Sequence, residues 1–300
     1  MALRHRRPDA QPRGKGAFVT ADIFDDTRCS LGEGPLWHPE RKQLFWFDIN
    51  AHRLYARTDA GKRMWQFDEF VSAAGWLDRD RLMVATETAL VEFDLATGRS
   101  AHLCDLEADN PATRSNDGRA DPYGGFWIGT MGKRAEPGAG AIYRYYRGEL
   151  RRLYPDWTIP NATCFTADGT TAYFADTTRA TIWRVALDAK GWPKGAPEVF
   201  LERPDARFTP DGAVVDTSGN LWCAHYGHGR VSVHAPDGRE IASHAVAARQ
   251  PTCPAFGGPG LETLYVTTAH QGMSAPGETD GCTFALAPGA KGQAEHRVIL

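Results

Sequence analysis

Six polar residues recur at equivalent positions of one repeated pattern, and four of them carry oxygen ligands. The pattern is a short apolar run, a turn and a second apolar run, and its first copy reads GEGPLWHPERKQLFWFD from Gly32. The polar positions of the six copies are Glu33, Ser72, Asn116, Asn161, Asp211 and Thr252. Glu, Asn and Asp supply the oxygen ligands that hard or borderline divalent cations take in proteins. If the copies form a ring, these residues meet at one place, and we expect a metal site there.

The second apolar run of each copy predicts a β-strand. Each run is short, rich in aromatic and β-branched residues, and preceded by a turn rich in Gly, Pro and Asp. A unit repeated about every 40–50 residues indicates a repeat architecture. The expected strands cover residues 44–49, 82–87, 126–131, 172–177, 221–226 and 264–269.

Further runs after each pair alternate polar and apolar residues, as half-buried outer strands do. Each unit therefore offers about four strands, which is the content of one propeller blade. The predicted fold is all-β, a six-bladed β-propeller with a metal site at the mouth of its central channel. The polar positions are expected in the loops that enter the innermost strands. Residues 17–26 are expected to close the ring by pairing with residues 284–286 or 298–300, which removes an open sheet edge.

Length alone does not decide between one large domain and two, and the repeat pattern favours one. The chain has 300 residues, of which 42% are hydrophobic and 24% charged, as is ordinary for a protein with a sizeable core. We expect a disordered N-terminal tail over residues 1–16 and one propeller domain over residues 17–300. A net charge of −3 is too small to indicate nucleic acid or an anionic membrane as partner. No apolar run is long enough to span a bilayer, and the oligomeric state stays open.

The cysteines indicate a reducing compartment. The six cysteines are scattered without a C-x-x-C pair, so no spacing supports a zinc-thiolate site. The basic N-terminus lacks the apolar run of a secretory signal. We therefore expect reduced thiols and a cytoplasmic location.

Several motifs, taken together and in this order, resemble the gluconolactonase/regucalcin family of sugar lactonases. They include SLGEGPLWHPERKQLFWFDI, RSNDGRADPYGGFWIGTM, PNATCFTADGTTAYFADT and PDGAVVDTSGNLWCAHYGHGRV. The resemblance extends from about residue 30 to residue 273. It implies a six-bladed propeller that holds one divalent metal ion, for which calcium, zinc, magnesium, manganese and ferrous iron all fit an oxygen-rich site.

The resemblance also implies roles for individual residues. Glu33, Asn161 and Asp211 match the metal ligands of the family, and Arg114 and Asn116 match its substrate contacts. The implied reaction is hydrolysis of a five- or six-membered sugar aldonolactone to the aldonic acid, a step of sugar catabolism. In that reaction we expect Asp211 also to take the proton from the attacking water. Where many members have Gly after the ligand asparagine, this chain has the small residue Ala162.

Four other residues are candidates with weaker support. Asp117 follows Asn116 and is a candidate residue of the substrate site, where it would touch the metal ion through water, support the ligands from behind or shape a turn. His225, at the end of an expected strand, is a candidate substrate contact or a plain surface histidine. Arg119 and Lys133 offer positive charge for a substrate with a second anionic group, or belong to the solvated surface.

Two alternatives to a sugar lactonase stay open. One is a promiscuous metal-dependent esterase or phosphotriesterase, because related propellers place a metal ion in the same channel. The other is a metal-binding regulatory or scaffold propeller without enzymatic activity.

Overall fold

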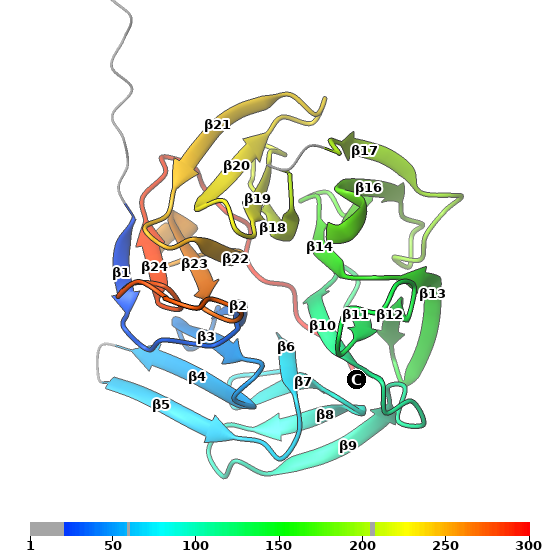
Figure 1. Cartoon of the computed structure of the whole chain (residues 1–300). Helices are drawn as coiled ribbons and strands as arrows, with labels where there is room; N and C mark the ends of the chain where they lie inside the picture. Colours follow the sequence, from blue (N-terminus) through cyan, green and yellow to red (C-terminus); the bar gives the residue numbers. More distant parts are fainter. Residues whose placement is uncertain (1–20, 59–60, 205–207) are drawn as a thin grey trace, which may run out of the picture.

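The structure is a ring of six antiparallel sheets around a central axis (Figure 1). It is a computed structural model, and it describes residues 21–58, 61–204 and 208–300. Each sheet has four strands, so the predicted all-β, six-bladed propeller is confirmed. The expected tail over residues 1–16 and the expected start of the domain at residue 17 lie outside the described residues.

The blades follow one another along the chain, and each runs from the channel outward. The innermost strands are β2 (Gly32–His38), β6 (Val71–Trp76), β10 (Thr113–Ala120), β14 (Pro160–Phe165), β18 (Pro210–Val215) and β22 (Gln250–Gly257). The second strands are β3 (Gln43–Asp48), β7 (Arg81–Thr86), β11 (Phe126–Gly132), β15 (Thr171–Asp176), β19 (Leu221–His225) and β23 (Thr263–Ala269).

The outer half of each blade completes the sheet. The third strands are β4 (Arg53–Thr58), β8 (Ala89–Asp94), β12 (Gly140–Tyr146), β16 (Thr181–Ala186), β20 (Arg230–His234) and β24 (Thr283–Leu286). The outermost strands are β5 (Gly61–Gln66), β9 (Ser100–Asp105), β13 (Glu149–Trp157), β17 (Glu198–Glu202), β21 (Glu240–Ala245) and β1 (Asp22–Asp25). Helical structure in the described part is limited to the 3₁₀ turns η1 (Thr177–Arg179) and η2 (Pro259–Leu261), and no described helix can cross a membrane.

The core lies between neighbouring blades, where the aromatic and aliphatic runs of the sequence meet. Trp127 of β11 is fully buried and packs against Phe165 and Phe174 of the next blade, with ring centroids 5.6 and 6.2 Å apart. Burial of large aromatic rings is a major part of the stability of such interfaces. The innermost strands contact one another in a closed ring, which brings their equivalent residues together.

The N-terminal strand closes the ring. Strand β1 pairs antiparallel with β24, so that Ile23 lies opposite Phe284. The expected pairing with residues 284–286 is confirmed, and the propeller has no open edge at this junction. The other expected partner, residues 298–300, lies elsewhere.

The last residues of the chain cross one end of the channel. This segment, residues 291–299, is called the C-terminal strap below. Gly292 forms a bridge with Asp216 at the end of β18, and Arg297 forms a bridge with Trp76 at the end of β6. Figure 1 shows the strap in red, passing across the ring toward the blade of β10. It therefore covers the end of the channel at which the innermost strands finish.

Candidate metal and substrate site

Each innermost strand carries a register shift at the predicted polar position. The shifts fall between Glu33 and Leu36, Val71 and Ala73, Ser115 and Gly118, Asn161 and Cys164, Pro210 and Ala213, and Pro251 and Pro254. The prediction that these residues occupy the loops before the strands is wrong, because they lie within the strands. A β-bulge leaves extra residues unpaired and changes the direction of their side chains. Bulges at equivalent positions of all six innermost strands thus change the direction of these side chains from that in a regular strand.

Glu33 and Asp211 form the negative centre of this level. Both are buried, with 7% and 5% of their surface exposed. Burial, together with the charge of Asp117, raises the pKa of Glu33 to about 8. Burial, together with the charges of Glu33 and Asp117, raises the pKa of Asp211 well above its usual range. The charge of Glu33 thus acts on Asp211, which places the two predicted carboxylate ligands in the same part of the molecule.

Asp117 is held between two blades. Its Oδ2 atom accepts a hydrogen bond of 2.7 Å from the backbone N–H of Thr163. Burial raises the pKa of Asp117, and its charge acts on both Glu33 and Asp211. The structure thus brings Asp117 to the same centre, where it adds a third negative charge.

A chain of hydrogen bonds links the predicted substrate contacts to the predicted amide ligand. Nη1 of Arg114 donates to Oδ1 of Asn116 at 2.9 Å. Nδ2 of Asn116 donates to the carbonyl oxygen of Pro160 and to Oδ1 of Asn161, each at 3.0 Å. A carbonyl oxygen can only accept, so these bonds determine which end of each amide is the oxygen. Both amide hydrogens of Asn116 are used, and Asn161 keeps one lone pair of Oδ1.

Thr177 completes this chain and was missed by sequence reasoning. Nδ2 of Asn161 donates to Oγ1 of Thr177 at 2.8 Å, and that hydroxyl donates to the carbonyl oxygen of Pro210 at 2.7 Å. Asn161 is thereby tied to the residue before Asp211. The signal available in the sequence was the polar end of the AYFADT run, which directly follows the buried part of its strand.

The side chains at the other two repeat positions, Ser72 and Thr252, form hydrogen bonds to neighbouring strands of the protein. Oγ of Ser72 donates to Oγ of Ser115 at 2.8 Å, and Oγ1 of Thr252 donates to the carbonyl oxygen of Gly32 at 2.5 Å. These short hydroxyls connect neighbouring innermost strands. The other four repeat positions therefore remain as candidates for ligand binding at the channel mouth: Glu33, Asn116, Asn161 and Asp211.

The side chain of His225 packs within its own blade, although its backbone pairs with Pro210, next to Asp211. Its Nε2 atom is 2.6 Å from Oγ of Ser232, and its ring packs against Phe208 with centroids 5.3 Å apart. Burial and nearby positive groups, of which Arg230 is the strongest, lower the pKa of His225 to about 3. The structure does not bring His225 together with Glu33 and Asp211.

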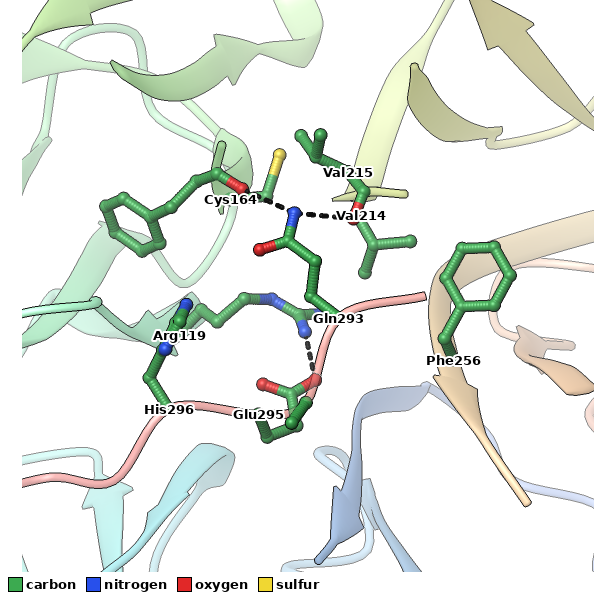
Figure 2. Close-up of a pocket in the computed structure, with 10 residues that line it drawn as sticks. Arg119, Cys164, Val214, Val215, Phe256, Gln293, Glu295 and His296 are labelled. Carbon is green, nitrogen blue, oxygen red and sulfur yellow. Dashed lines mark hydrogen bonds and ion pairs between the residues drawn. The ribbon is translucent and has the colours of Figure 1, made fainter. Parts of the chain in front are cut away.

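The two candidate cations for a second anionic group are already paired. Lys133 forms an ion pair with Glu87 at the mouth, and Arg119 forms one with Glu295 of the C-terminal strap. Figure 2 shows Arg119 and Glu295 facing each other in the cavity where the strap crosses the channel. Arg119 therefore belongs to the closed end of the channel, below Asp117.

The charges and donor atoms of the mouth fit a divalent cation. Three buried carboxyl groups, those of Glu33, Asp117 and Asp211, lie around the single guanidinium of Arg114. Their raised pKa values reflect the cost of ionising them together without a cation, and a divalent cation would favour their ionised forms. Within the described ranges, no three His, Cys, Asp or Glu side chains form a metal-binding cluster by themselves. The predicted ligand set contains two carboxylates, from Glu33 and Asp211, and one amide. It can hold a metal ion with three protein ligands only if the amide oxygen of Asn161 also binds the ion. Such oxygen donors suit hard divalent cations.

Comparison with known proteins gives the family. A family model described as the SMP-30/Gluconolactonase/LRE-like region matches residues 31–270. The chain belongs to this family. A relative named putative sugar lactone lactonase, from Rhizobium meliloti, is 40% identical, and the match covers 91% of this chain and 95% of the relative. A pentonolactonase from Haloferax volcanii is 34% identical over 93% of this chain and 98% of its own length.

The fold of this SMP-30/gluconolactonase family member also matches solved structures. A calcium-binding protein, regucalcin, from Agrobacterium tumefaciens is similar with a TM-score of 0.91 and 38% identity. The match covers 94% of this chain and 98% of the other. The resemblance inferred from the motifs is thereby confirmed for the whole propeller.

Proposed function

We propose that this chain is a metal-dependent lactonase that opens an uncharged sugar aldonolactone to its aldonic acid. The observation that carries the proposal is the meeting of Glu33 and Asp211 beside the oriented amide oxygen of Asn161. Relatives named as sugar lactone lactonase and pentonolactonase, aligned over nearly the whole chain, support the choice of substrate class.

Glu33, Asn161 and Asp211 would hold the divalent cation. A cation in such a site polarises an ester carbonyl and lowers the pKa of a water molecule. The calcium-binding regucalcin among the similar structures supports a divalent ion. Calcium, zinc, magnesium, manganese and ferrous iron are the candidates that the test must compare.

The protein side chains take the remaining roles. Asp211 accepts the proton of the attacking water, a general-base role that an ionised carboxylate can perform. Arg114 donates to the carbonyl oxygen as negative charge develops there. Its Nη1 hydrogens bond Asn116 and the carbonyl oxygen of Ser115, and its Nε and Nη2 groups have no hydrogen-bond partner among the described residues.

Asn116 positions its neighbours in this proposal. Its side-chain oxygen orients Arg114. Its two amide hydrogens bond to the side-chain oxygen of Asn161 and to the backbone carbonyl of Pro160, the residue before Asn161. Asp117 strengthens the negative potential that draws the cation into the mouth.

The paired cations favour an uncharged substrate. Lys133 is neutralised by Glu87, and Arg119 is neutralised by Glu295 at the closed end of the channel. Binding of a second anionic group by Lys133 or by Arg119 would require one of these pairs to open. A neutral five- or six-membered aldonolactone fits without that cost.

The thiols support a reducing compartment. All six cysteines are free, and five of them are buried. Free thiols are typical of proteins in the cytoplasm, and we propose that location for the reaction.

The decisive experiment measures acid release from a panel of neutral and anionic aldonolactones, in the metal-free protein and after each candidate metal is added. We expect hydrolysis of neutral lactones that depends on metal and is lost with chelator. Asp211→Ala should abolish turnover while the circular dichroism spectrum is retained. Near-normal hydrolysis by that variant would refute the role of Asp211. Activity on aryl esters or phosphotriesters alone, or on no substrate, would overturn the lactonase proposal.

A further inference from the structure

Tyr226 lies at the channel mouth without a role in the reaction described so far. It follows β19 directly, at the end of the blade where β18 begins with Pro210 and Asp211. Its half-buried ring packs in a cluster with Leu31 and Ala269, which belong to the blades of β2 and β22. The side chain of Tyr226 therefore extends from the blade of β18 to the boundary between the blades of β22 and β2.

Two amides hold the hydroxyl of Tyr226. Nε2 of Gln250 donates to it at 2.5 Å, and Nε2 of Gln271 donates to it at 3.2 Å. Nε2 of Gln250 also donates to the backbone carbonyl of Gln271 at 3.1 Å, and Oε1 of Gln271 accepts from Nδ2 of Asn50 at 3.0 Å. The bond to a backbone carbonyl determines that this atom of Gln250 is nitrogen. The amide of Gln271 is assigned with its oxygen toward Asn50 and its nitrogen toward the hydroxyl of Tyr226. In this arrangement both amides donate to the hydroxyl.

The proton of this hydroxyl is left to point elsewhere. A phenol oxygen accepts two hydrogen bonds and donates one, and both acceptor positions of Tyr226 are used. No described residue accepts its proton. Burial raises the pKa of Tyr226, and the charges of Asp211 and Glu33 raise it further. The hydroxyl is thus neutral at working pH and lies within electrostatic reach of the two carboxylates.

Tyr226 and Arg114 approach the carboxylate pair from different blades. Arg114 belongs to β10 and Tyr226 to the blade of β18. A lactone has two oxygens on its reacting carbon, the carbonyl oxygen and the ring oxygen. Two donors on different sides of the site can serve one oxygen each.

We propose that Tyr226 is a further catalytic residue, whose hydroxyl donates a hydrogen bond to the ring oxygen of the lactone as that oxygen leaves. This inference rests on the proposed lactonase function. In the step, the oxygen of water bonds to the carbonyl carbon and the bond from that carbon to the ring oxygen breaks. Asp211 takes a proton from the water and returns it to the ring oxygen, which becomes the hydroxyl of the product. Tyr226 keeps its own proton throughout and stabilises the negative charge on the leaving oxygen.

The test compares Tyr226→Phe with the wild-type holoenzyme on the best lactone of the panel. We expect kcat to fall by about 10²-fold, as when one donor to a developing oxyanion is removed. KM and the affinity for the activating metal, measured by calorimetry, should change less than threefold. Tyr154→Phe is the matched control, because the Tyr154 hydroxyl is buried without a partner on outer strand β13, and its kcat should equal that of wild type.

A second variant tests whether the hydroxyl proton of Tyr226 must be free to point at the substrate. In Gln271→Glu the new carboxylate can only accept, so the Tyr226 hydroxyl should donate to it and kcat should fall as in Tyr226→Phe. An unchanged kcat in Tyr226→Phe, a rise confined to KM, or a parallel loss of metal affinity would each overturn the catalytic role. Wild-type protein that hydrolyses no lactone would refute the proposed function instead, so the two failures are distinguishable.

Discussion

Arg114 is the cation that opposes the raised pKa of both Glu33 and Asp211. Its own pKa is lowered to about 10 by burial, against the raising effect of these two carboxylates and Glu87. A buried guanidinium with free N–H groups beside such a pair is well placed to bind a developing oxyanion. The residue therefore links the electrostatics of the mouth to the proposed reaction.

Replacement of Arg114 tests this link. Arg114→Ala should lower kcat/KM on the preferred lactone by about 10²-fold or more, because the donor to the carbonyl oxygen is lost. Steady-state kinetics of the metal-loaded variant provide the measurement. Arg63→Ala, on the exposed outer strand β5, is the matched control. A value of kcat/KM close to wild type in Arg114→Ala would contradict the assignment.

At the level of the strands, the bulges determine where the site residues point. In the first bulge Gly34 has a φ of +52°, and a Cβ atom there would lie 2.3 Å from the carbonyl oxygen of Ser72. The equivalent Ala162 has a φ of +57° and is fully buried, so this chain tolerates a left-handed alanine in the bulge of β14. Space, more than the backbone angle, makes glycine necessary at position 34.

Gly34→Ala should therefore be costly. We expect a loss of about 3 kcal/mol in the free energy of unfolding, from backbone strain and from overpacking against β6. Gly148→Ala is the control, because that φ is +84° and no atom lies within 4 Å of the added Cβ. It should cost about 1 kcal/mol from the backbone angle alone. Equal urea midpoints for the two variants would show that the bulge has room for a side chain.

The C-terminal strap is the second element that shapes the channel. Glu295 pairs with Arg119, whose Nε is buried without a hydrogen-bond partner among the described residues. Glu295→Ala should lower the free energy of unfolding by about 3 kcal/mol, because it leaves a buried guanidinium uncompensated. Urea denaturation measures the loss. The double variant Arg119→Met, Glu295→Met should recover much of it, and an unchanged midpoint in Glu295→Ala would argue against a structural ion pair.

For the whole molecule, the charges at the mouth couple stability to pH and metal. Without metal, the pKa of Glu33 is raised from its ordinary value near 4.5 to about 8, and that of Asp211 is also raised. The folded state then binds more protons than the unfolded state over this range. Its stability must therefore fall as the pH rises.

The melting temperature of the metal-free protein should fall between pH 5 and pH 8, by about 2 °C or more per pH unit. Metal binding needs both carboxylates ionised, so metal affinity should rise over the same range. At 100 times its dissociation constant, the metal should add about 2.7 kcal/mol of stability. Calorimetric melting with and without metal checks both effects. In Glu33→Gln the melting temperature of the metal-free protein should depend less on pH. An unchanged dependence of melting temperature on pH would contradict its origin in the carboxylate of Glu33.

The sequence by itself determined the six-bladed, all-β architecture and the equivalent positions of its six copies. This was possible because a repeat encodes its own equivalences, although the copies lie far apart in the chain. The choice of Glu33, Asn161 and Asp211 as metal ligands came from the resemblance to the family and stays a prediction. Closure by the N-terminal strand followed from the need to remove an open sheet edge.

Only the tertiary structure decided how the side chains act at that mouth. It placed the polar residues in bulges within the strands, kept His225 inside its blade, and paired Lys133 and Arg119 with acids. It also brought Tyr226 to the site and laid the C-terminal strap across the channel. These contacts join residues that no local pattern relates, and burial and charge act on them only once the ring has closed.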